Sequence, residues 1–571
     1  MFSVLKRWQP APRISAEADH DLQDYPPVFR QILYNRGYGT KEAARQFLEA
    51  KLSQSSDASL MSDLPEAVDR ILWAVQKQEP ISVYGDYDAD GVTATALLVQ
   101  VIRSLGGTVS EYIPNRFDEG YGLNNEALNT LYERGVRLVI TVDCGIRSLP
   151  EAEHAKSLGI DLIITDHHHP SEELPQAFAI INPKQPGDLY PDKDLAGVGI
   201  AYKLAEGLIM RSPDGSNTTQ LNIEDTLDLV AIGTISDLAP LVGENRSLVK
   251  AGLTKIRHPS RQGIMALMGV SGLIPGRVKS TDIGYTLGPR LNAAGRLESA
   301  LDAYHLLTTD DVGEAGFLAQ KLDDQNRFRQ EITRQIQKQS EEMAMAEDPD
   351  AMLIFTAHPD FNPGVVGLAA TRLSEVYYRP VIIAHQGEAF TRGSGRSIPE
   401  FHITNALDQC ADLLEHHGGH AAAAGFTVRT EKLPELKERL SRIANEQLQN
   451  RDLRPVLTPD AEVTLSELQP ELIEYLDWLQ PTGYGNRDAS FLTRDVRVVR
   501  SRPVGKDYAH LKFTVSDGWV TYDAIAFRQG YWYERLPLMV DLIFAFEMNE
   551  YNGMKSLQLN VRDLKPSGYN D

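Results

Sequence analysis

Short apolar, β-branched runs alternate with polar turns and with segments of helical spacing between residues 81 and 240. The run Ile81–Tyr84 leads through a polar turn into Val92–Val99, whose apolar residues have the period of a helix. Further strand-like runs lie at 108–114, 137–142, 161–165 and 178–182, with helices expected at 124–134 and 150–158. This alternation predicts an α/β fold with a parallel sheet covered by helices on both faces.

The pattern changes twice in the second half of the chain. Residues 310–349 are rich in Gln, Glu, Arg and Lys with apolar residues at helical spacing, which predicts one long connecting helix. A smaller α/β unit is expected next, opening with the apolar run Met352–Phe355 and ending near a polar linker at 449–455. Short strand-like runs then predict a small β-barrel, at 496–499, 510–515, 520–527, 539–546 and 557–561.

Composition and charge narrow the class of protein only modestly. With 571 residues, the chain is too long for one hydrophobic core, and its 42% hydrophobic and 24% charged residues are ordinary for a globular protein. The formal charge, 57 − 79 = −22, argues against a protein that coats nucleic acid nonspecifically, although a local basic channel stays compatible.

Cysteine content and hydropathy bear on the compartment. The two cysteines, Cys144 and Cys410, make a disulfide framework or a thiolate zinc site implausible and fit a reducing cytoplasm. The chain carries no apolar stretch long enough for a signal peptide or a membrane span, so no membrane association is expected.

Acidic and imidazole side chains gather where apolar, strand-like runs end. The eight members of this group are Asp86, Asp88, Asp90, Asp143, Asp166, His167, His168 and Asp237. Ligands of an open parallel sheet bind beyond the carboxyl ends of its strands, so these residues are expected to meet on one rim. A single aspartate at a strand end could equally well be the N-cap of the following helix as a metal ligand. N-capping does not account for three acids in five positions or for adjoining histidines.

The residue types in this group indicate hard divalent cations. Oxygen ligands with one or two imidazoles favour Mn²⁺ or Mg²⁺ over zinc, and the imidazoles favour Mn²⁺ of these two. Two such ions lower the pKa of a bridging water and stabilise the charge that develops on a phosphate. Asp166 could either bind metal or orient a histidine. The group therefore predicts a metal-dependent phosphoesterase.

The same clusters, in this order, resemble those of the DHH phosphoesterase superfamily, which is named for the motif seen here as Asp166-His167-His168. Supporting motifs are Tyr84–Gly91, Val142–Gly145, Ile235–Asp237, Gly288–Arg296 and Gly418–Phe426. The last resembles the signature of a DHHA1 substrate-binding domain. Taken as a set, the motifs resemble the branch of bacterial single-strand-specific 5′→3′ DNA exonucleases.

The resemblance implies a two-metal site. Its expected ligands are Asp86, Asp88, Asp90, Asp143, His167, His168 and Asp237, of which Asp88, Asp90, Asp143, His167 and His168 are also expected to be catalytic. Asp166 is expected to orient a histidine ligand and not to bind the metal itself. Smaller phosphatases of the superfamily carry a histidine at the position of Tyr84, and this departure leaves the coordination by Asp86 open.

The resemblance also names the parts of the chain. They are an N-terminal helical segment (1–60), a DHH domain (61–309), the connecting helix (310–349), a DHHA1 domain (350–450) and an OB-like barrel (456–571). An OB barrel offers a groove in which aromatic faces stack on unpaired bases. Its candidate contributors are Phe513, Trp519, Tyr522, Phe527, Lys506 and Lys512, although most of the aromatic residues suit the barrel core better.

Contacts to a nucleic acid are expected outside the metal ligands. The candidates are Arg290, Arg296, Arg372, Arg396, Gly418, Gly419 and His420. Paired glycines before His420 would let the backbone approach a phosphate, whereas Ala421–Ala424 alone would suit a tightly packed helix. Arg392–Ser397 is predicted as a phosphate-contacting loop, with an exposed glycine hairpin as the alternative.

Three functions fit this sequence. The first is a cytoplasmic, monomeric exonuclease that removes nucleotides from the 5′ end of single-stranded DNA in repair and recombination, with single-strand-binding protein and a helicase as candidate partners. The second is a phosphodiesterase of oligoribonucleotides or cyclic dinucleotides, and the third a noncatalytic DNA-binding scaffold of the same fold. The first is favoured, because relatives of the second kind typically lack a C-terminal OB domain and those of the third lose metal ligands.

Overall fold

The computed structural model describes residues 5–54, 56–115, 119, 122–212, 221–551 and 553–569. The chain divides into two compact units. The large unit combines Pro12–Asn326 with Asp460–Ser567, and the small unit consists of Arg327–Pro459 together with the two ends of the chain, up to Ala11 and from Gly568. No helix among the described residues is both long and apolar enough to cross a membrane.

The predicted parallel sheet is present in the large unit. Its strands are β2 (Ile81–Gly85), β3 (Val109–Tyr112), β4 (Leu138–Val142), β5 (Asp161–Thr165) and β6 (Ala179–Ile181). Their order is β3-β2-β4-β5-β6, and each neighbouring pair is parallel. Strands β2 and β4 are buried along their whole length, as expected for parallel strands covered on both faces.

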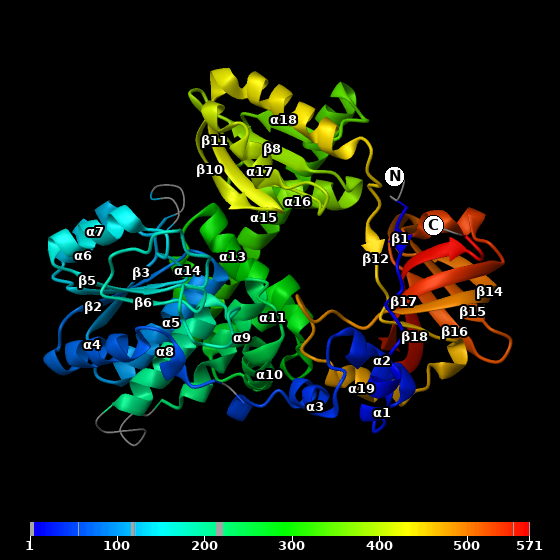
Figure 1. The fold of residues 1–571 in the computed structure, drawn as a ribbon, viewed down its shortest axis with the longest axis horizontal. Coiled ribbons are helices and arrows are strands. Elements are labelled where there is room, and N and C mark those ends of the chain that lie inside the picture. Colours follow the sequence, from blue (N-terminus) through cyan, green and yellow to red (C-terminus); the bar gives the residue numbers. More distant parts are fainter. Residues whose placement is uncertain are drawn as a thin grey trace. The chain divides into compact units, whose positions relative to one another are not determined.

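Helices cover both faces of this sheet (Figure 1). On one face lie α6 (Asn125–Glu133) and α7 (Leu149–Leu158), and on the other lie α4 (Leu64–Lys77), α5 (Ala89–Ser104) and α8 (Gly197–Arg211). Successive strand residues point to opposite faces, so Val139 packs in the core cluster of α6 and α7 while Ile140 packs in that of α4, α5 and α8.

A helical layer follows the sheet in sequence, and one of its members corrects a prediction. The apolar run before Asp237, taken as a strand, is helix α9 (Leu227–Ser236), and its residues from Leu227 to Ile235 are all buried. An apolar run without alternation does not distinguish a buried strand from a buried helix. The other helices are α10 (Gly243–Arg257), α11 (Gln262–Ser271), α13 (Gly288–Leu297) and α14 (Leu301–Thr308), with a π-helical turn at Ile283–Leu287.

The C-terminal barrel is also confirmed. It consists of β14 (Phe491–Val504), β15 (His510–Ser516), β16 (Thr521–Ala526), β17 (Met539–Tyr551) and β18 (Met554–Pro566). The order β14-β15-β16-β18-β17 is closed by pairing of β14 with β17. Leu22, directly after α1 (Ala16–Asp21), and the helices α2 (Pro27–Asn35) and α3 (Lys41–Glu49) share the core of this region. The ring centroid of Phe29 lies 5.4 Å from that of Tyr475.

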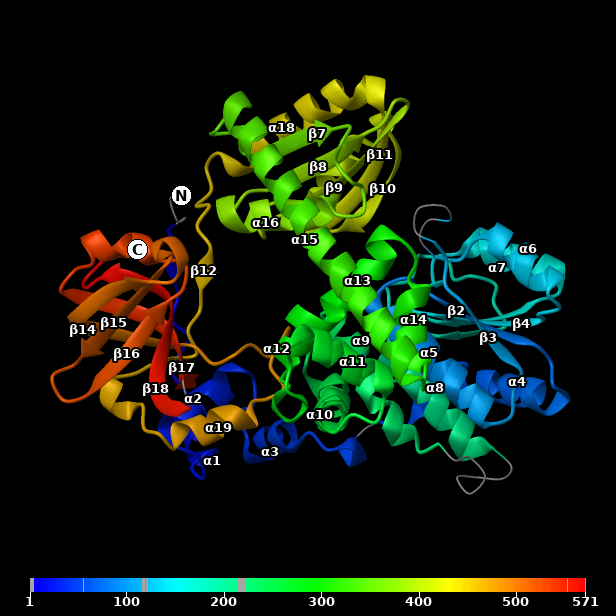
Figure 2. The ribbon, with the colours of Figure 1, turned by 180° about the vertical axis from the view of Figure 1, so that it is seen from behind.

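The predicted long helix is α15 (Val312–Glu347), 36 residues that lead from the large unit into the small one (Figure 2). The sheet of the small unit has the order β10-β11-β9-β8-β7. Its strands are β7 (Ile354–His358), β8 (Val381–Gln386), β9 (Phe390–Arg396), β10 (Leu414–His420) and β11 (Ala423–Arg429), accompanied by α16 (Val366–Tyr377), α17 (Ile403–Asp408) and α18 (Leu433–Leu448). Within this sheet, the described strands β7 and β8 pair in parallel, and the other neighbouring strands pair antiparallel.

Two glycine-rich and alanine-rich segments of the small unit differ from their predictions. Arg392–Arg396 belongs to strand β9, which pairs with β8 and β11, and is not a loop. Its glycine at 393 leaves room for a neighbouring ring, since a β-carbon there would lie 2.2 Å from the ring of Phe426. The run Ala421–Ala424 is not helical, because it joins β10 to β11 in an antiparallel hairpin.

One buried cation connects separate segments of the large unit. Arg246, on α10, is 1% exposed. Its guanidinium donates hydrogen bonds of 2.8 to 3.0 Å to the backbone oxygens of Phe47, Trp478, Leu479, Gln480 and Pro481. These bonds use all the donors of the fork. Burial lowers the pKa of Arg246 to about 10, so the side chain still carries its charge at neutral pH.

Replacing Arg246 with methionine is expected to destabilise the large unit by about 3 kcal/mol or more, because buried carbonyl oxygens lose their donors. Denaturant unfolding followed by circular dichroism measures this change. Arg211→Met serves as the control, since Arg211 is half-exposed and pairs with exposed Asp69, an interaction worth less than about 1 kcal/mol. Equal stability of the two variants would contradict a connecting role for Arg246.

Candidate metal centre

The strand ends bring the predicted acidic and imidazole side chains together. Asp86 follows β2, Asp143 follows β4 and Asp166 follows β5, and these strands are neighbours in the sheet. Three overlapping groups could each hold a cation, with their ligand atoms within 4.8 Å of one another. The groups are Asp86, Asp88 and Asp143; Asp90, His167 and Asp237; and Asp143, His167 and His168.

Asp88 is both an N-cap and a member of this cluster. Its Oδ1 accepts the backbone N–H groups of Asp90 (2.9 Å) and Gly91 (3.1 Å) at the start of α5. The N-cap alternative is therefore realised at this residue. Since a carboxylate has two oxygens, capping with one leaves the other able to bind a cation.

Asp90 is held by the first turn of a different helix, α8. It is 1% exposed, and its two oxygens accept the N–H groups of Gly197 (Oδ2, 2.7 Å) and Val198 (Oδ1, 2.9 Å) at the start of α8. Burial and the neighbouring Asp88 carboxylate raise the pKa of Asp90 to about 7, against the opposing effect of these N–H groups. The site therefore binds a proton readily when no cation neutralises it.

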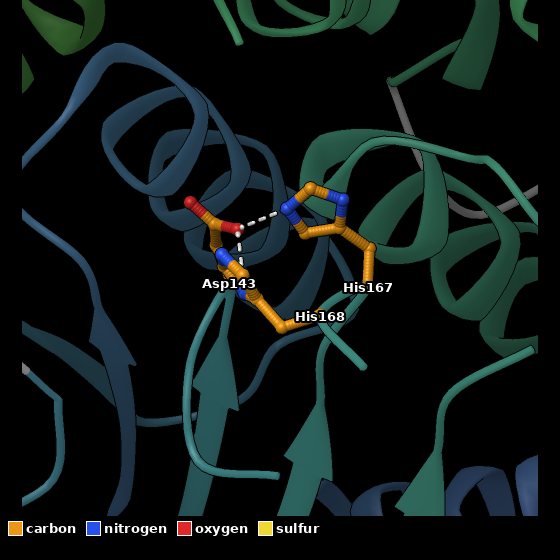
Figure 3. A group of neighbouring side chains, drawn as sticks. All are labelled: Asp143, His167 and His168. Atoms are coloured by element: carbon orange, nitrogen blue, oxygen red, sulfur yellow. Dashed lines mark ion pairs between the residues drawn. The ribbon is translucent and has the colours of Figure 1, made fainter. Parts of the chain in front are cut away.

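Asp143 and the two histidines face one another (Figure 3). The Oδ1 atom of Asp143 lies 3.0 Å from Nε2 of His167 and 4.0 Å from Nδ1 of His168. Oδ1 of Asp143 and Nε2 of His167 are buried, and neither atom makes a hydrogen bond with any described residue. Burial lowers the pKa of His167 to about 3, so the imidazole is neutral at neutral pH and is not a charged partner for the Asp143 carboxyl group. A carboxylate oxygen and an imidazole nitrogen facing each other in this way suit a shared cation.

The backbone of Asp143 is also unusual. Its φ of 61° lies in the left-handed region. Residues other than glycine rarely adopt this backbone conformation, and those that do cluster at functional sites. Burial and the nearby carboxylates, Asp90 first among them, raise the pKa of Asp143 well above its usual value. Strain and charge are thus concentrated at the same residue.

Asp166 points into the protein and holds His168. Its Oδ1 accepts the ring Nδ1–H of His168 at 2.7 Å and the backbone N–H of His168 at 3.0 Å, and its Oδ2 accepts the N–H of Ile146. Although burial lowers the pKa of His168, the bond to Asp166 and the nearby carboxylates raise it to about 9. This arrangement fits Asp166 as the residue that orients the histidine.

Asp237 enters the cluster from a helix and not from a strand. It ends α9, and its Oδ2 lies 3.7 Å from Nε2 of His167. Burial and the carboxylates of Asp90 and Asp88 raise the pKa of Asp237 to about 8. The backbone of the next residue, Leu238, is left-handed with a φ of 61°.

Arg290, in the motif Gly288–Arg296, makes contacts within the large unit. Arg290 pairs with fully buried Asp323 at 2.8 Å and donates to the backbone oxygen of Thr286, so its guanidinium is held within the large unit. Asn292, which the sequence did not single out, supports the acidic loop, because its Oδ1 accepts the N–H of Ala89 at 2.7 Å. Arg296 is half-buried at the end of α13.

The remaining predicted contacts lie in the small unit. Gly418, Gly419 and His420 end strand β10, and the His420 side chain is exposed. Arg396 is half-buried and donates to Oγ of Ser394 (3.1 Å), and burial lowers its pKa. Arg372 is half-buried on α16.

Affinity for Mn²⁺ is expected to rise with pH between about pH 6 and about pH 8.5. Below the raised pKa values of Asp90 (about 7) and Asp237 (about 8), an entering cation must displace protons. Each displaced proton adds up to about tenfold in affinity per pH unit. Titration of Mn²⁺ followed by electron paramagnetic resonance measures this slope. Asp237→Asn is expected to flatten it, and a pH-independent affinity of the unmodified chain would contradict the raised pKa values.

Comparison with known proteins accords with this geometry. Three family models match: the DHH family N-terminal domain over residues 80–234, the DHHA1 domain over 350–446 and the RecJ OB domain over 459–563. The single-stranded-DNA-specific exonuclease RecJ of Bacillus subtilis is 39% identical over 541 residues, covering 94% of this chain and 68% of the relative. The protein of the same name from Escherichia coli is 36% identical over 565 residues, covering 95% and 96%.

Solved structures give the same result. The crystal structure of RecJ in complex with Mn²⁺ from Thermus thermophilus matches with a TM-score of 0.84 and 30% identity, over 99% of this chain and 80% of that one. The Mg²⁺ complex from the same organism matches with a TM-score of 0.77. With this arrangement of domains and these relatives along nearly its whole length, the chain belongs to the RecJ family of DHH phosphoesterases.

Proposed function

We propose that this chain is an exonuclease that hydrolyses the phosphodiester bonds of single-stranded DNA with two divalent cations, Mn²⁺ or Mg²⁺. The observation that carries this proposal is the buried rim at which carboxylates and imidazoles from three strand ends and from α9 lie within 4.8 Å in overlapping groups. The relatives named as single-stranded-DNA-specific exonucleases, and the solved relatives that hold Mn²⁺ or Mg²⁺, support it.

The overlapping groups suggest how the ligands are shared. Asp86 and Asp88 would serve one cation, and Asp90, His167 and Asp237 the other. Asp143 belongs to two groups and has two carboxylate oxygens, so it would contribute to both. His168 would complete the site. Its Nδ1 is engaged by Asp166, so the second ring nitrogen is the one that would bind a cation. When bound, the two cations would lower the pKa of a water and neutralise charge on the scissile phosphate.

The chain's own groups keep this site in place. Two N–H groups of α8 hold Asp90, the start of α5 holds Asp88, and Asn292 holds the backbone at Ala89. Because these contacts exist before any cation binds, little reorganisation would be needed on binding. A preorganised set of ligands is what rapid phosphodiester hydrolysis requires.

Selection of an unpaired strand would come from the barrel and the small unit. Trp519 (93% exposed) and Phe527 (51%) offer faces for stacking on bases, whereas Phe513 (1%) belongs to the barrel core. Arg296, Arg372, Arg396, Gly418, Gly419 and His420 remain the proposed contacts to the phosphate backbone. Arg290 stays in this set of proposed contacts, with its guanidinium paired to Asp323.

Several finer features belong to the same proposal. Digestion would run from 5′ to 3′, in DNA repair and recombination, by a monomer that works with single-strand-binding protein and a helicase. Free thiols at the buried residues Cys144 and Cys410 suit a cytoplasmic protein. A dinucleotide phosphodiesterase or a noncatalytic scaffold is not favoured, because the barrel is present and every predicted ligand position is filled.

The test is digestion of oligonucleotides labelled at either end, single-stranded or duplex, in the presence of Mn²⁺. The chain is expected to release the 5′ label from single strands first and to leave blunt duplexes largely intact. Preference for a dinucleotide, or release of the 3′ label first, would contradict the proposal.

Asp88→Asn is the matched variant for this assay. Asparagine is as good an N-cap as aspartate, so the fold of α5 is retained while an anionic ligand is lost. Cleavage is expected to fall at least about 1000-fold, which corresponds to about 4 kcal/mol of transition-state stabilisation, because a weakened cation site stabilises less phosphate charge. Fluorescence anisotropy should still detect DNA binding. Cleavage near the unmodified rate would remove Asp88 from the mechanism.

A further inference from the structure

The first turn of α8 packs directly against the acidic cluster. The N–H groups of Gly197 and Val198 donate to the two oxygens of Asp90, at 2.7 and 2.9 Å, across a separation of more than 100 residues in sequence. The cap residue of this helix is Ala196, whose side chain cannot accept a hydrogen bond. Asp90 therefore satisfies N–H groups that a local cap would otherwise satisfy.

Gly197 also makes room for a second carboxylate. A β-carbon at this position would lie 2.8 Å from Cβ, 2.9 Å from Oδ1 and 3.0 Å from Cγ of Asp143. These three nearest atoms all belong to one proposed ligand. Gly197 is the first residue of α8, and its φ is outside the left-handed region, so the backbone conformation does not require glycine. Alanine is the better helix former by about 1 kcal/mol in a helix interior.

We propose that Gly197 is a positioning residue of the metal centre: it brings the first turn of α8 onto Asp90 while leaving space for the carboxylate of Asp143. This inference rests on the proposed function, since it concerns the same site. Asp143 has little freedom to move away. It is 2% exposed, its φ is already 61°, and its Oδ1 lies 3.0 Å from His167. Any group added at 197 must therefore displace the carboxylate or α8.

The same helix provides a matched control. A β-carbon on Gly199 would meet Leu195 at 3.4 and 3.6 Å and Asn245 at 3.9 Å, close to ordinary contact distances. Gly199→Ala therefore adds the same methyl group to the same helix without reaching the metal ligands. Gly233 is less suitable than Gly197 for testing contact with a metal ligand, because a β-carbon there would clash with Thr93 and Val198 as well as with Asp90.

The first experiment compares Mn²⁺ binding by the full chain, its Gly197→Ala variant and its Gly199→Ala variant, using the resonance of free Mn²⁺. Gly197→Ala is expected to lose about tenfold or more in affinity for at least one ion, the size of effect seen when groups that orient metal ligands are changed. Gly199→Ala is expected to bind as the unmodified chain does. Equal affinity of the two variants would overturn the proposal.

The second experiment needs neither metal nor activity. Asp143→Gly removes the three clashing atoms, and glycine suits a φ of 61°. In the presence of a chelator, Gly197→Ala is expected to lower the Tm of the unmodified chain but to leave the Tm of Asp143→Gly nearly unchanged. This coupling remains measurable if Gly197→Ala alone folds poorly, since the double variant should recover.

The two experiments separate the possible failures. A Tm decrease of the same size in both backgrounds would place the clash elsewhere and overturn the inference. Absence of Mn²⁺ binding by the unmodified chain would contradict the proposed function, while the metal-free coupling would still decide whether Gly197 positions Asp143.

Discussion

Repulsion between buried carboxylates is the constraint on which the rest of this structure depends. Asp86, Asp90 and Asp143 are 4%, 1% and 2% exposed, and they lie near Asp88 and Asp237. Anions this close and this far from water cannot all stay charged without positive charge or hydrogen-bond donors. The raised pKa values of Asp90, Asp143 and Asp237 express this cost, and two divalent cations would remove it.

The fold meets this constraint by placing donors and space around the rim. The parallel sheet brings three strand ends to one edge, and the starts of α5 and α8 supply N–H groups to Asp88 and Asp90. Asp166 accepts a hydrogen bond from the ring of His168 and so orients it, and the absence of a side chain at Gly197 leaves room for the carboxylate of Asp143. The groups that surround the ligands thus shape the site as much as the ligands do, since they fix where each oxygen lies before a cation arrives.

The sequence predicted the parts of this site that follow from local patterns. Strand periodicity and the rule for parallel strand ends placed Asp86, Asp143 and Asp166 together, and the structure confirms the fold class. Asp237 was expected at a strand end but ends a buried helix, because uniform apolarity hides the period that distinguishes the two. Asn292, Gly197 and the pairing of Arg290 with Asp323 escaped prediction, since each depends on a contact between residues far apart in sequence.

The number of Mn²⁺ ions bound per chain tests this site most directly, by equilibrium dialysis at about pH 8.5, which is above the raised pKa values of Asp90 (about 7) and Asp237 (about 8). Two ions are expected for the unmodified chain, and tight binding is expected to be lost when Asp143, shared between two groups of ligands, is replaced by alanine. A single ion, or two ions held equally tightly without Asp143, would contradict the proposed two-metal site.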